Sequence, residues 1–154
     1  MLEVKNLKVV FHQNSNPVVA VNDFSFSIAA GETLGLVGES GSGKTVSSLA
    51  LLGLLNNKNV AISGNASFSL QQPVDLLTLN EKQLTAIRGR HIAMIMQEPM
   101  QAFNPLFTCG HQVTEAIRKH TALNKNDATE KVLQQFEKVK LPNPLQISKR
   151  FPHQ

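Results

Sequence analysis

Residues 38–45, Gly-Glu-Ser-Gly-Ser-Gly-Lys-Thr, combine residue types and a spacing that could bind phosphate. They fit the pattern G-x-x-x-x-G-K-[ST], in which backbone N–H groups surround a β-phosphate and glycine permits the close approach. A helix that begins near Gly43 would add its own unpaired N–H groups and the positive end of its dipole. Lys44 would supply a mobile charge to the β- and γ-phosphates, and Thr45 a hydroxyl to Mg²⁺. The segment therefore predicts a binding site for a nucleoside triphosphate.

The residues on either side of this loop predict the elements that position it. Residues 33–37 are a short apolar run without polar alternation, which is typical of a strand covered on both faces in a parallel sheet. Residues 46–55 are helical in pattern and are followed by Asn56 and Asn57, which we expect to end the helix. The glycines thus lie where a buried strand becomes a helix, which is the context that the motif requires.

Three segments with period-two alternation predict an antiparallel sheet. Residues 4–11 and 19–28 alternate apolar with polar positions, and the polar residues 12–17 between them predict a turn. Residues 61–70 alternate again, with apolar side chains at Ile62, Ala66, Phe68 and Leu70. We expect this third strand to return to the same sheet.

The second half of the chain is predicted to be mainly helical. Asn80 with Gln83 forms a capping pattern for a short helix that reaches Arg88, and residues 91–96 predict a second buried strand. Residues 97–107 contain two prolines and are expected to form a loop, and residues 113–120 form a helix. A further helix is predicted over 127–140, capped by Asp127 and Glu130, while the last dozen residues are expected to be irregular. One face of that helix would consist of Ala128, Val132, Leu133, Phe136 and Val139.

Composition restricts the class of protein. With 154 residues, 42% hydrophobic and 17% charged, the chain is long enough for one globular domain. The net charge is +4, but the basic residues are scattered and Trp and Tyr are absent, so no nucleic-acid partner is expected. The longest apolar runs are far shorter than the roughly 20 residues of a membrane helix, so no direct membrane span is expected either. Cys109 is the single cysteine, which excludes an internal disulfide.

Two blocks of sequence resemble a known family. Residues 34–45 resemble the phosphate loop of ABC-transporter ATPases, and within them most closely the oligopeptide, dipeptide and nickel importer group. That group carries an antiparallel strand pair that ends in a Gly-Glu turn, as Gly31 and Glu32 do here. Residues 87–106 are similar to the family's Q-loop region, including its Asn-Pro-Leu variant. Phe11 falls where the family has an aromatic residue that stacks on adenine, although packing in the core is an equal alternative for it.

The resemblance implies a fold and a division into parts. The expected fold is α/β: an incomplete P-loop NTPase core of the ABC ATPase type with an N-terminal antiparallel β-subdomain and part of the helical subdomain. Residues 1–30 and 60–72 would form the antiparallel β-subdomain, and residues 31–58 and 78–97 the P-loop core. Residues 98–154 would contain the Q-loop and part of the helical subdomain.

The resemblance also implies ATP and Mg²⁺ as cofactors. Lys44 and Gln97 would take part in catalysis, because the Gln97 amide could reach Mg²⁺ and the attacking water. Thr45 and Gln97 would be the residues at the metal. The nucleotide would be bound by Gly38, Glu39, Ser40, Gly41, Ser42, Gly43, Lys44, Thr45, Val46 and Phe11.

The expected function is that of the ATP-binding, energy-coupling subunit of an ABC importer for peptides or nickel. Members of the family act as head-to-tail pairs of ATPase subunits together with transmembrane permease subunits. The protein would therefore be cytoplasmic and peripheral, held on the inner face of the plasma membrane by the permease. The transported substrate is not specified by this sequence, since selectivity in such systems lies in other subunits.

Several family motifs are absent from the sequence. After a segment like Arg-Phe-Pro-His-Gln at 150–154, the family continues with a Leu-Ser-Gly-Gly signature, a Walker B strand and a switch histidine. Asp75 precedes the Q-loop and His153 precedes the signature position, so neither can replace those residues. We expect a piece truncated before the signature, which binds nucleotide at most, does not hydrolyse ATP alone and has exposed edges that favour self-association. The alternatives are a noncatalytic nucleotide-binding fragment and another P-loop kinase or NTPase.

Overall fold

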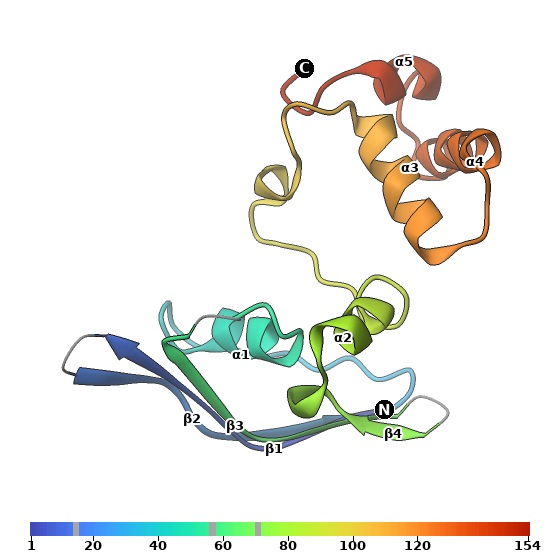
Figure 1. The fold of residues 1–154 in the computed structure, drawn as a ribbon. Coiled ribbons are helices and arrows are strands. Elements are labelled where there is room, and N and C mark those ends of the chain that lie inside the picture. Colours follow the sequence, from blue (N-terminus) through green and yellow to red (C-terminus); the bar gives the residue numbers. More distant parts are fainter. Residues whose placement is uncertain (14–15, 56–57, 70–71) are drawn as a thin grey trace. The chain divides into compact units, whose positions relative to one another are not determined.

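The structure is a computed structural model that describes residues 1–13, 16–55, 58–69 and 72–154. The chain divides into two compact units, Met1–Arg88 and Gly89–Gln154. We refer to them as the N-terminal unit and the helical unit, and each is described by itself (Figure 1). The division falls within residues 78–97, which the sequence assigned to the core.

The N-terminal unit is built on a four-stranded antiparallel sheet with the strand order β2-β1-β3-β4 (Figure 1). The three predicted strands are confirmed, while the short β4 was not predicted. The parts of those predictions that fall on residues 14–15 and on Leu70 lie outside the described residues. The strands are β1 (Leu2–Gln13), β2 (Asn16–Ile28), β3 (Val60–Ser69) and β4 (Pro73–Asp75).

A bulge in β2 changes which side chains of that strand face the core. Val9 of β1 pairs with Val21, whereas the next residue, Val10, pairs with Val19, so Ala20 is an extra residue in β2. Val9 and Val21 are buried, while Val19 is exposed. Sequence alternation alone placed Val19 and Val21 on one face, and the bulge is the reason that only one of them is in the core.

Helix α1 (Lys44–Leu51) packs against β1, β2 and the 3₁₀ turn η1 (Leu76–Thr78). It ends earlier than predicted, with Leu52 as the C-cap, and the predicted stop at Asn56 and Asn57 lies outside the described residues. Helix α2 (Glu81–Ile87) begins with the predicted capping box: the side chain of Asn80 accepts the N–H of Gln83 and the reverse bond is also present. The core of the unit joins buried side chains of the sheet to buried side chains of α1, its C-cap, η1 and α2. The first set is Val4, Leu7, Val9, Val21 and Ala66, and the second is Ala50, Leu51, Leu52, Leu76, Leu84 and Ile87.

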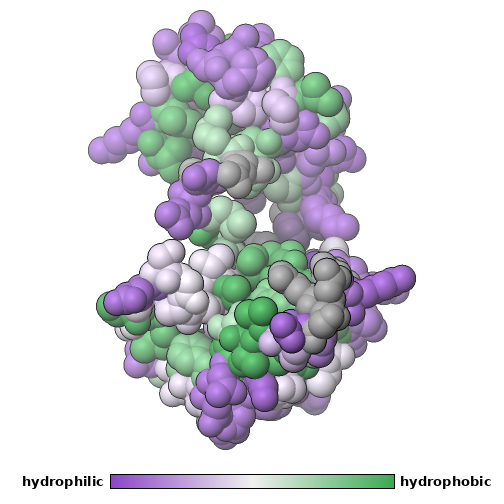
Figure 2. Space-filling model, turned by 90° about the vertical axis from the view of Figure 1, so that its left-hand side faces the viewer, coloured by the Kyte–Doolittle hydropathy of each residue, from purple (hydrophilic) through white to green (hydrophobic). Residues whose placement is uncertain are grey.

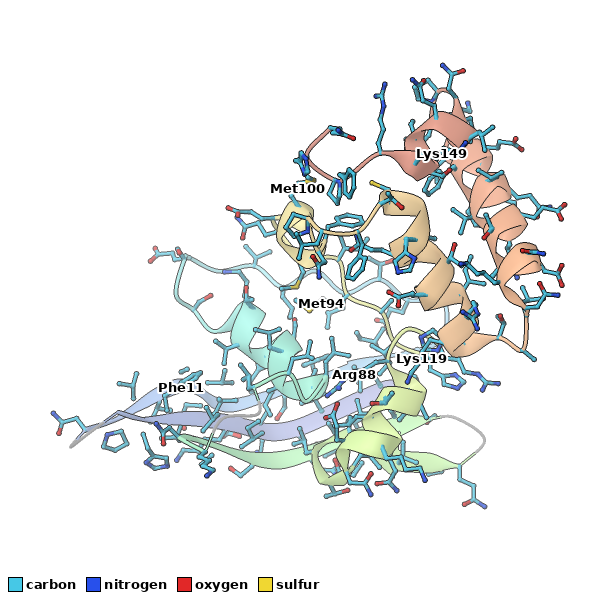
Figure 3. The ribbon with its side chains drawn as sticks, turned by 45° about the horizontal axis from the view of Figure 1, so that its top comes forward. Phe11, Arg88, Met94, Met100, Lys119 and Lys149 are labelled. Carbon is cyan, nitrogen blue, oxygen red and sulfur yellow. The ribbon has the colours of Figure 1, made fainter. Side chains whose placement is uncertain are left out.

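Arg88, the residue that follows α2, fastens the end of α1. Its guanidinium donates to the carbonyls of Leu52, at 2.7 Å from Nε, and Gly53, at 3.0 Å from Nη2. It also pairs with the carboxylate of Glu81 at 2.6 Å. The position of Arg88 at the end of α2 is visible in Figure 3. These bonds, which we call the Arg88 clamp, hold the carboxyl end of α1. The amino end of the same helix follows the phosphate loop.

The helical unit contains three helices that pack on one another and one 3₁₀ turn (Figure 1). These are η2 (Pro99–Ala102), α3 (Cys109–His120), α4 (Lys125–Lys138) and α5 (Pro144–Lys149). On α4, the predicted inward residues Ala128, Val132 and Phe136 are buried, but Leu133 is half-buried and Val139 is exposed. No helix among the described residues has both the length and the apolar character needed to cross a membrane.

Two predictions about helix ends were wrong. The N-cap of α4 is Asn124, whose side chain accepts the N–H groups of Asn126 and Asp127, so Asp127 lies inside the first turn. Asp127 supports this cap by accepting the side-chain N–H of Asn124 at 2.8 Å. The terminal residues were expected to be irregular, yet they contain α5. Pro144 lies in its first turn, where a missing N–H costs nothing.

The two buried strands predicted over residues 33–37 and 91–96 are not strands in the structure. Val37 is 99% exposed and Ile95 is 92% exposed. An apolar run becomes a strand only when a neighbour pairs with its backbone groups, and among the described residues the only sheet is the antiparallel one. Val37 and Ile95 therefore face solvent. Figure 2 shows that hydrophobic residues contribute to the surface of the chain.

Candidate phosphate-binding site

The loop at residues 38–43 depends on glycine at two positions with left-handed backbone angles. Gly41 has φ of +84° and Gly43 has φ of +88°. A Cβ atom on Gly43 would also lie 2.6 Å from the carbonyl oxygen of Ala20. Gly43 is therefore required both by its backbone angle and by the close approach of β2. Because Ala20 is the bulged residue of that strand, sequence reasoning could not have found this contact.

Lys44 lies against the oxygen atoms of its own loop. Its ammonium group donates to the carbonyl of Gly38 at 2.6 Å, to the carbonyl of Glu39 at 2.8 Å and to the hydroxyl of Ser42 at 3.0 Å. A Cβ atom on Gly38 would lie 2.8 Å from the Ser42 hydroxyl, so a larger residue there would make this side chain shift. The loop thus surrounds a positive charge, and the contact of Lys44 with phosphate remains a prediction.

The start of α1 directs unpaired N–H groups toward the loop. Gly43 is the N-cap and has no side chain that could cap the helix. The backbone bond from Ser47 N–H to the Gly43 carbonyl, at 2.8 Å, closes the first turn. The N–H groups of Lys44, Thr45 and Val46 precede that bond and have no acceptor within the helix. Together with the helix dipole, these donors favour an anion at this position.

Thr45 differs from the other hydroxyl residues of α1. The Ser47 hydroxyl donates to the Gly43 carbonyl at 3.0 Å, and the Ser48 hydroxyl donates to the Lys44 carbonyl at 3.2 Å. Thr45 is exposed, and its hydroxyl has no hydrogen-bond partner in the described part of the chain. It remains available as an oxygen ligand, so the residues present fit a phosphate chain with a bound divalent cation.

The loop is accessible from the side of β2. A cavity of about 230 Å³ lies there, between the loop with the start of α1 and the bulged part of the strand. It is lined by Ser42, Lys44 and Ser47 on one side and by Val21, Asn22 and Phe24 on the other. Glu39, Ser40 and Gly41 are exposed as well. The predicted binding loop is therefore open to a ligand and not buried under side chains.

The other two predicted site residues lie outside this loop. Phe11 is half-buried on β1, two residues beyond the fully buried Val9 and hence on the same face of the strand (Figure 3). Stacking on adenine and packing in the core both remain open for Phe11. Gln97 is exposed in the helical unit, at a bend that precedes η2. Its role at the metal remains a prediction.

Asp75, which the sequence excluded as a Walker B acid, has a structural role. One carboxylate oxygen accepts the N–H groups of Ala66, at 3.0 Å, and Leu77, at 3.1 Å. The other oxygen accepts the side-chain N–H of Asn65 at 2.8 Å. Asp75 thereby caps η1 and ties it to β3. An aspartate often accepts the backbone N–H of the residue two positions later, and this local tendency could have indicated the cap from the sequence.

Comparison with known proteins identifies the family of the chain. Residues 21–151 match the family described as ABC transporter. The sequence identity to the oligopeptide transport ATP-binding protein OppD of Salmonella typhimurium is 40%, over the whole of this chain and 45% of OppD. The identity to the glutathione import ATP-binding protein GsiA of Shigella dysenteriae is 38%, over the whole of this chain and 25% of GsiA. The chain thus spans less than half of the length of these curated relatives.

Solved structures show the same fold. All of the chain superimposes with a TM-score of 0.81 on 62% of a dimeric ATP-binding cassette in a post-hydrolysis state bound to ADP and Pi, at 20% identity. A dimeric bacterial ABC transporter cassette gives a TM-score of 0.80 over 99% of the chain and 62% of the cassette, at 19% identity. The predicted fold class, a partial ABC ATPase fold, is therefore confirmed.

Proposed function

The chain belongs to the ABC transporter family, and we propose that it forms the ATP-binding part of a subunit that supplies energy to an importer. The observation that carries this proposal is the loop at residues 38–43. It encloses the ammonium group of Lys44 and lies directly before the uncapped amino end of α1. This arrangement supports the binding of a polyanion, and membership of the family identifies that polyanion as the triphosphate of ATP. The alternative of an unrelated P-loop kinase is set aside on the same ground.

Within this site each residue has a proposed role. The N–H groups at residues 41–46 and the ammonium of Lys44 bind phosphate oxygens, and the hydroxyl of Thr45 binds Mg²⁺. When bound, Mg²⁺ supplies positive charge that offsets charge on the phosphates. Phe11 is the proposed contact of the adenine ring. Gln97 is proposed to reach Mg²⁺ and the attacking water in the whole protein.

The substrate and the partners are proposed from the relatives. OppD and GsiA are named for the transport of oligopeptides and glutathione, which supports peptides as the imported class. Nickel remains the alternative that the sequence suggested. We propose that the whole protein hydrolyses ATP as one of two ATPase subunits, and that permease subunits hold it at the inner face of the plasma membrane. The 154-residue chain alone is proposed to bind nucleotide without hydrolysing it.

The Mg²⁺ part of the proposal is tested by two substitutions of Thr45. Thr45→Val keeps the shape of the side chain but removes the hydroxyl, whereas Thr45→Ser keeps the hydroxyl. Titration with a fluorescent ATP analogue, with Mg²⁺ and with EDTA, should show that Mg²⁺ tightens binding to the unmodified chain and to Thr45→Ser. In Thr45→Val the increase in affinity caused by Mg²⁺ should be at least about fivefold smaller, because a hydrogen bond or ligand contact of this kind is worth on the order of 1 kcal/mol. An equal increase in affinity with Mg²⁺ in all three proteins would contradict the assignment of Thr45 as a Mg²⁺ ligand.

A further inference from the structure

Asn6 of β1 and Asp23 of β2 share an unusual backbone conformation and bond to each other. Asn6 has φ of +51° and Asp23 has φ of +53°, which is the left-handed region that Asn and Asp tolerate best among residues with a side chain. The side-chain N–H of Asn6 donates to the carboxylate of Asp23 at 2.5 Å. The backbone N–H of Asn6 donates to the hydroxyl of Ser25 at 2.8 Å. Both members of the pair are exposed, so they do not belong to the core.

Each of the two residues lies where its strand contains one extra residue. Three cross-strand pairs bracket them: Val4–Phe26, Leu7–Phe24 and Val9–Val21. Between the first and the second pair, β1 advances by three residues and β2 by two, so β1 has the extra residue and Asn6 lies there. Between the second and the third pair, β2 has the extra residue and Asp23 lies there. The two bulges cancel, and the third pair has the same register as the first.

The strand on the other side of β1 leaves room for the bulge at Asn6. The pairing of β1 with β3 shifts at the same place, between Lys5 and Lys8. Gly64 of β3 has φ of +115°, and a Cβ atom there would lie 2.7 Å from the carbonyl oxygen of Asn6 and 2.8 Å from that of Lys5. Glycine is therefore needed where the two backbones approach. The bulge of β1 is thus matched by Gly64 on one side and by Asp23 on the other.

The register that results from the two bulges determines which residues of β2 meet the phosphate loop. Four residues of β2 line the cavity beside that loop: Ala20, Val21, Asn22 and Phe24. Asp23 lies between the last two in the sequence. Without the extra residue in β2, Val9 would pair with Asn22 instead of Val21. Val21, which is 6% exposed, would then leave the core, and the approach of β2 to Gly43 would change.

We propose that the Asn6–Asp23 pair positions β2 for nucleotide binding, because it closes two matched bulges and so fixes the part of β2 that lines the cavity at the phosphate loop. This inference rests on the proposed function for the identity of the ligand. Its structural half, the register of β2 against β1, concerns the two strands alone. Among the described residues that line the cavity neither Asn6 nor Asp23 is present, so both are positioning residues that act through the neighbours of Asp23 in β2.

The pair is tested by exchanging its members. Asn6→Asp removes the donor and places two carboxylates against each other, whereas Asp23→Asn keeps an oxygen that can accept the bond. In the double variant the amide at position 23 can donate to the carboxylate at position 6. Titration with a fluorescent ATP analogue should show that Asn6→Asp binds at least about fivefold more weakly. Asp23→Asn and the double variant should bind within about twofold of the unmodified chain.

Two further variants separate the bond from charge and from backbone angle. Ser63→Asp adds the same charge at an exposed position of β3, opposite Lys8, and should leave the affinity unchanged. Asn6→Gly accepts the left-handed angle but cannot bond to Asp23, and should weaken binding at least about threefold. If charge alone acted, Asp23→Asn would strengthen binding by the factor by which Asn6→Asp weakens it. Far-UV circular dichroism establishes that each variant is folded.

The register itself is measured by nuclear Overhauser contacts between backbone protons. The unmodified chain should show a cross-strand contact between Val9 and Val21. In Asn6→Asp this contact should weaken and one between Val9 and Asn22 should appear, because the unmatched bulge of β1 carries the register of the preceding pair forward. Burial of Val21 opposes this slip, so we expect a partial change, and the double variant should restore the original contact.

Each result decides part of the inference. A contact between Val9 and Val21 that is missing from the unmodified chain, or that is unchanged in Asn6→Asp and Asn6→Gly, would overturn it entirely. A changed register with unchanged affinity, or with effects on affinity that simply add in the double variant, would overturn the role in nucleotide binding. If the unmodified chain does not bind the analogue, the proposed function is wrong and the positioning role fails with it. The backbone contacts then still decide whether the pair fixes the register.

Discussion

Single residues account for the shape of the phosphate loop. Lys44 contacts two carbonyls and one hydroxyl of residues that precede it, so the loop is organised around this cation. Gly43 is required because a Cβ atom would collide with the backbone carbonyl of Ala20, whereas at Gly38 a Cβ atom would make the Ser42 side chain shift. Gly41 is favoured by its left-handed backbone angle alone, because its Cβ position has no described atom within 4 Å apart from those of its chain neighbours. The loop therefore contains three glycines, at positions that differ in what a side chain would meet.

These reasons predict different costs of substitution by alanine. Gly43→Ala combines a left-handed backbone angle with a clash at 2.6 Å, and should lower the free energy of unfolding by about 2 kcal/mol or more. Gly41→Ala, which has the angle but open space, should cost on the order of 1 kcal/mol. Gly35→Ala is the control, with neither feature, and should change stability by less than about 0.5 kcal/mol. Urea unfolding followed by far-UV circular dichroism measures the series, and equal costs at all three positions would refute this explanation.

At the scale of elements, the attachment of α1 to α2 by Arg88 can be divided into two contributions. The ion pair with Glu81 is largely solvent-exposed on the Glu81 side, at 63%, and such pairs contribute roughly 0–1 kcal/mol. The bonds to the carbonyls of Leu52 and Gly53 satisfy the end of α1 and are charge-assisted. The carbonyl bonds should therefore dominate.

Two substitutions separate these contributions. Arg88→Ala should lower the free energy of unfolding by about 2 kcal/mol, whereas Glu81→Ala should lower it by less than about 1 kcal/mol. Arg88→Lys should restore little, because an ammonium group cannot reproduce the planar fork of donors that reaches both the carbonyls and the carboxylate. Thermal or urea unfolding of the three variants makes the comparison. A cost of Glu81→Ala equal to that of Arg88→Ala would show that the ion pair, and not the cap, is the main contribution.

The elements also show what the sequence could predict. Strands β1, β2 and β3, the capping box of α2 and the loop before α1 follow from local signals: alternation, an Asn-x-x-Gln pattern and glycine spacing. The bulge at Ala20, the clamp at Arg88 and the bond between Asn6 and Asp23 join residues through tertiary packing, and no local pattern indicates them. Residues 33–37 and 91–96 have the composition of buried strands, but composition does not supply the paired neighbour that a strand needs.

On the scale of the whole molecule, charge is unevenly distributed between the units. The N-terminal unit has six Lys or Arg and six Asp or Glu, for a net charge of zero. The helical unit has nine and five, and so carries the entire net charge of +4. The attraction of the phosphate loop for an anion is therefore local, and arises from Lys44 and the N–H groups of α1 instead of from the overall charge of its unit.

Exposed apolar side chains predict that this 154-residue chain self-associates. Val37, at 99% exposure, lies in a segment that is not part of any sheet among the described residues. Val37→Lys should reduce association measured by analytical ultracentrifugation by at least about threefold, because it places a charge on that segment. Val139→Lys is the matched control, since Val139 is 67% exposed but lies directly after α4. Equal effects of the two substitutions would mean that association depends on general charge and not on this segment.

The most direct test of the whole account is a titration of a fluorescent ATP analogue with Mg²⁺ into the unmodified chain, Lys44→Ala and Lys82→Ala. Both variants lose one positive charge from the same unit, but Lys82 is exposed on α2 and lies outside the loop. We predict that Lys44→Ala weakens binding at least about tenfold, because a charge-assisted contact is worth roughly 1.5–3 kcal/mol, while Lys82→Ala binds like the unmodified chain. Equal affinity of Lys44→Ala and the unmodified chain would contradict the placement of the phosphates at residues 38–45.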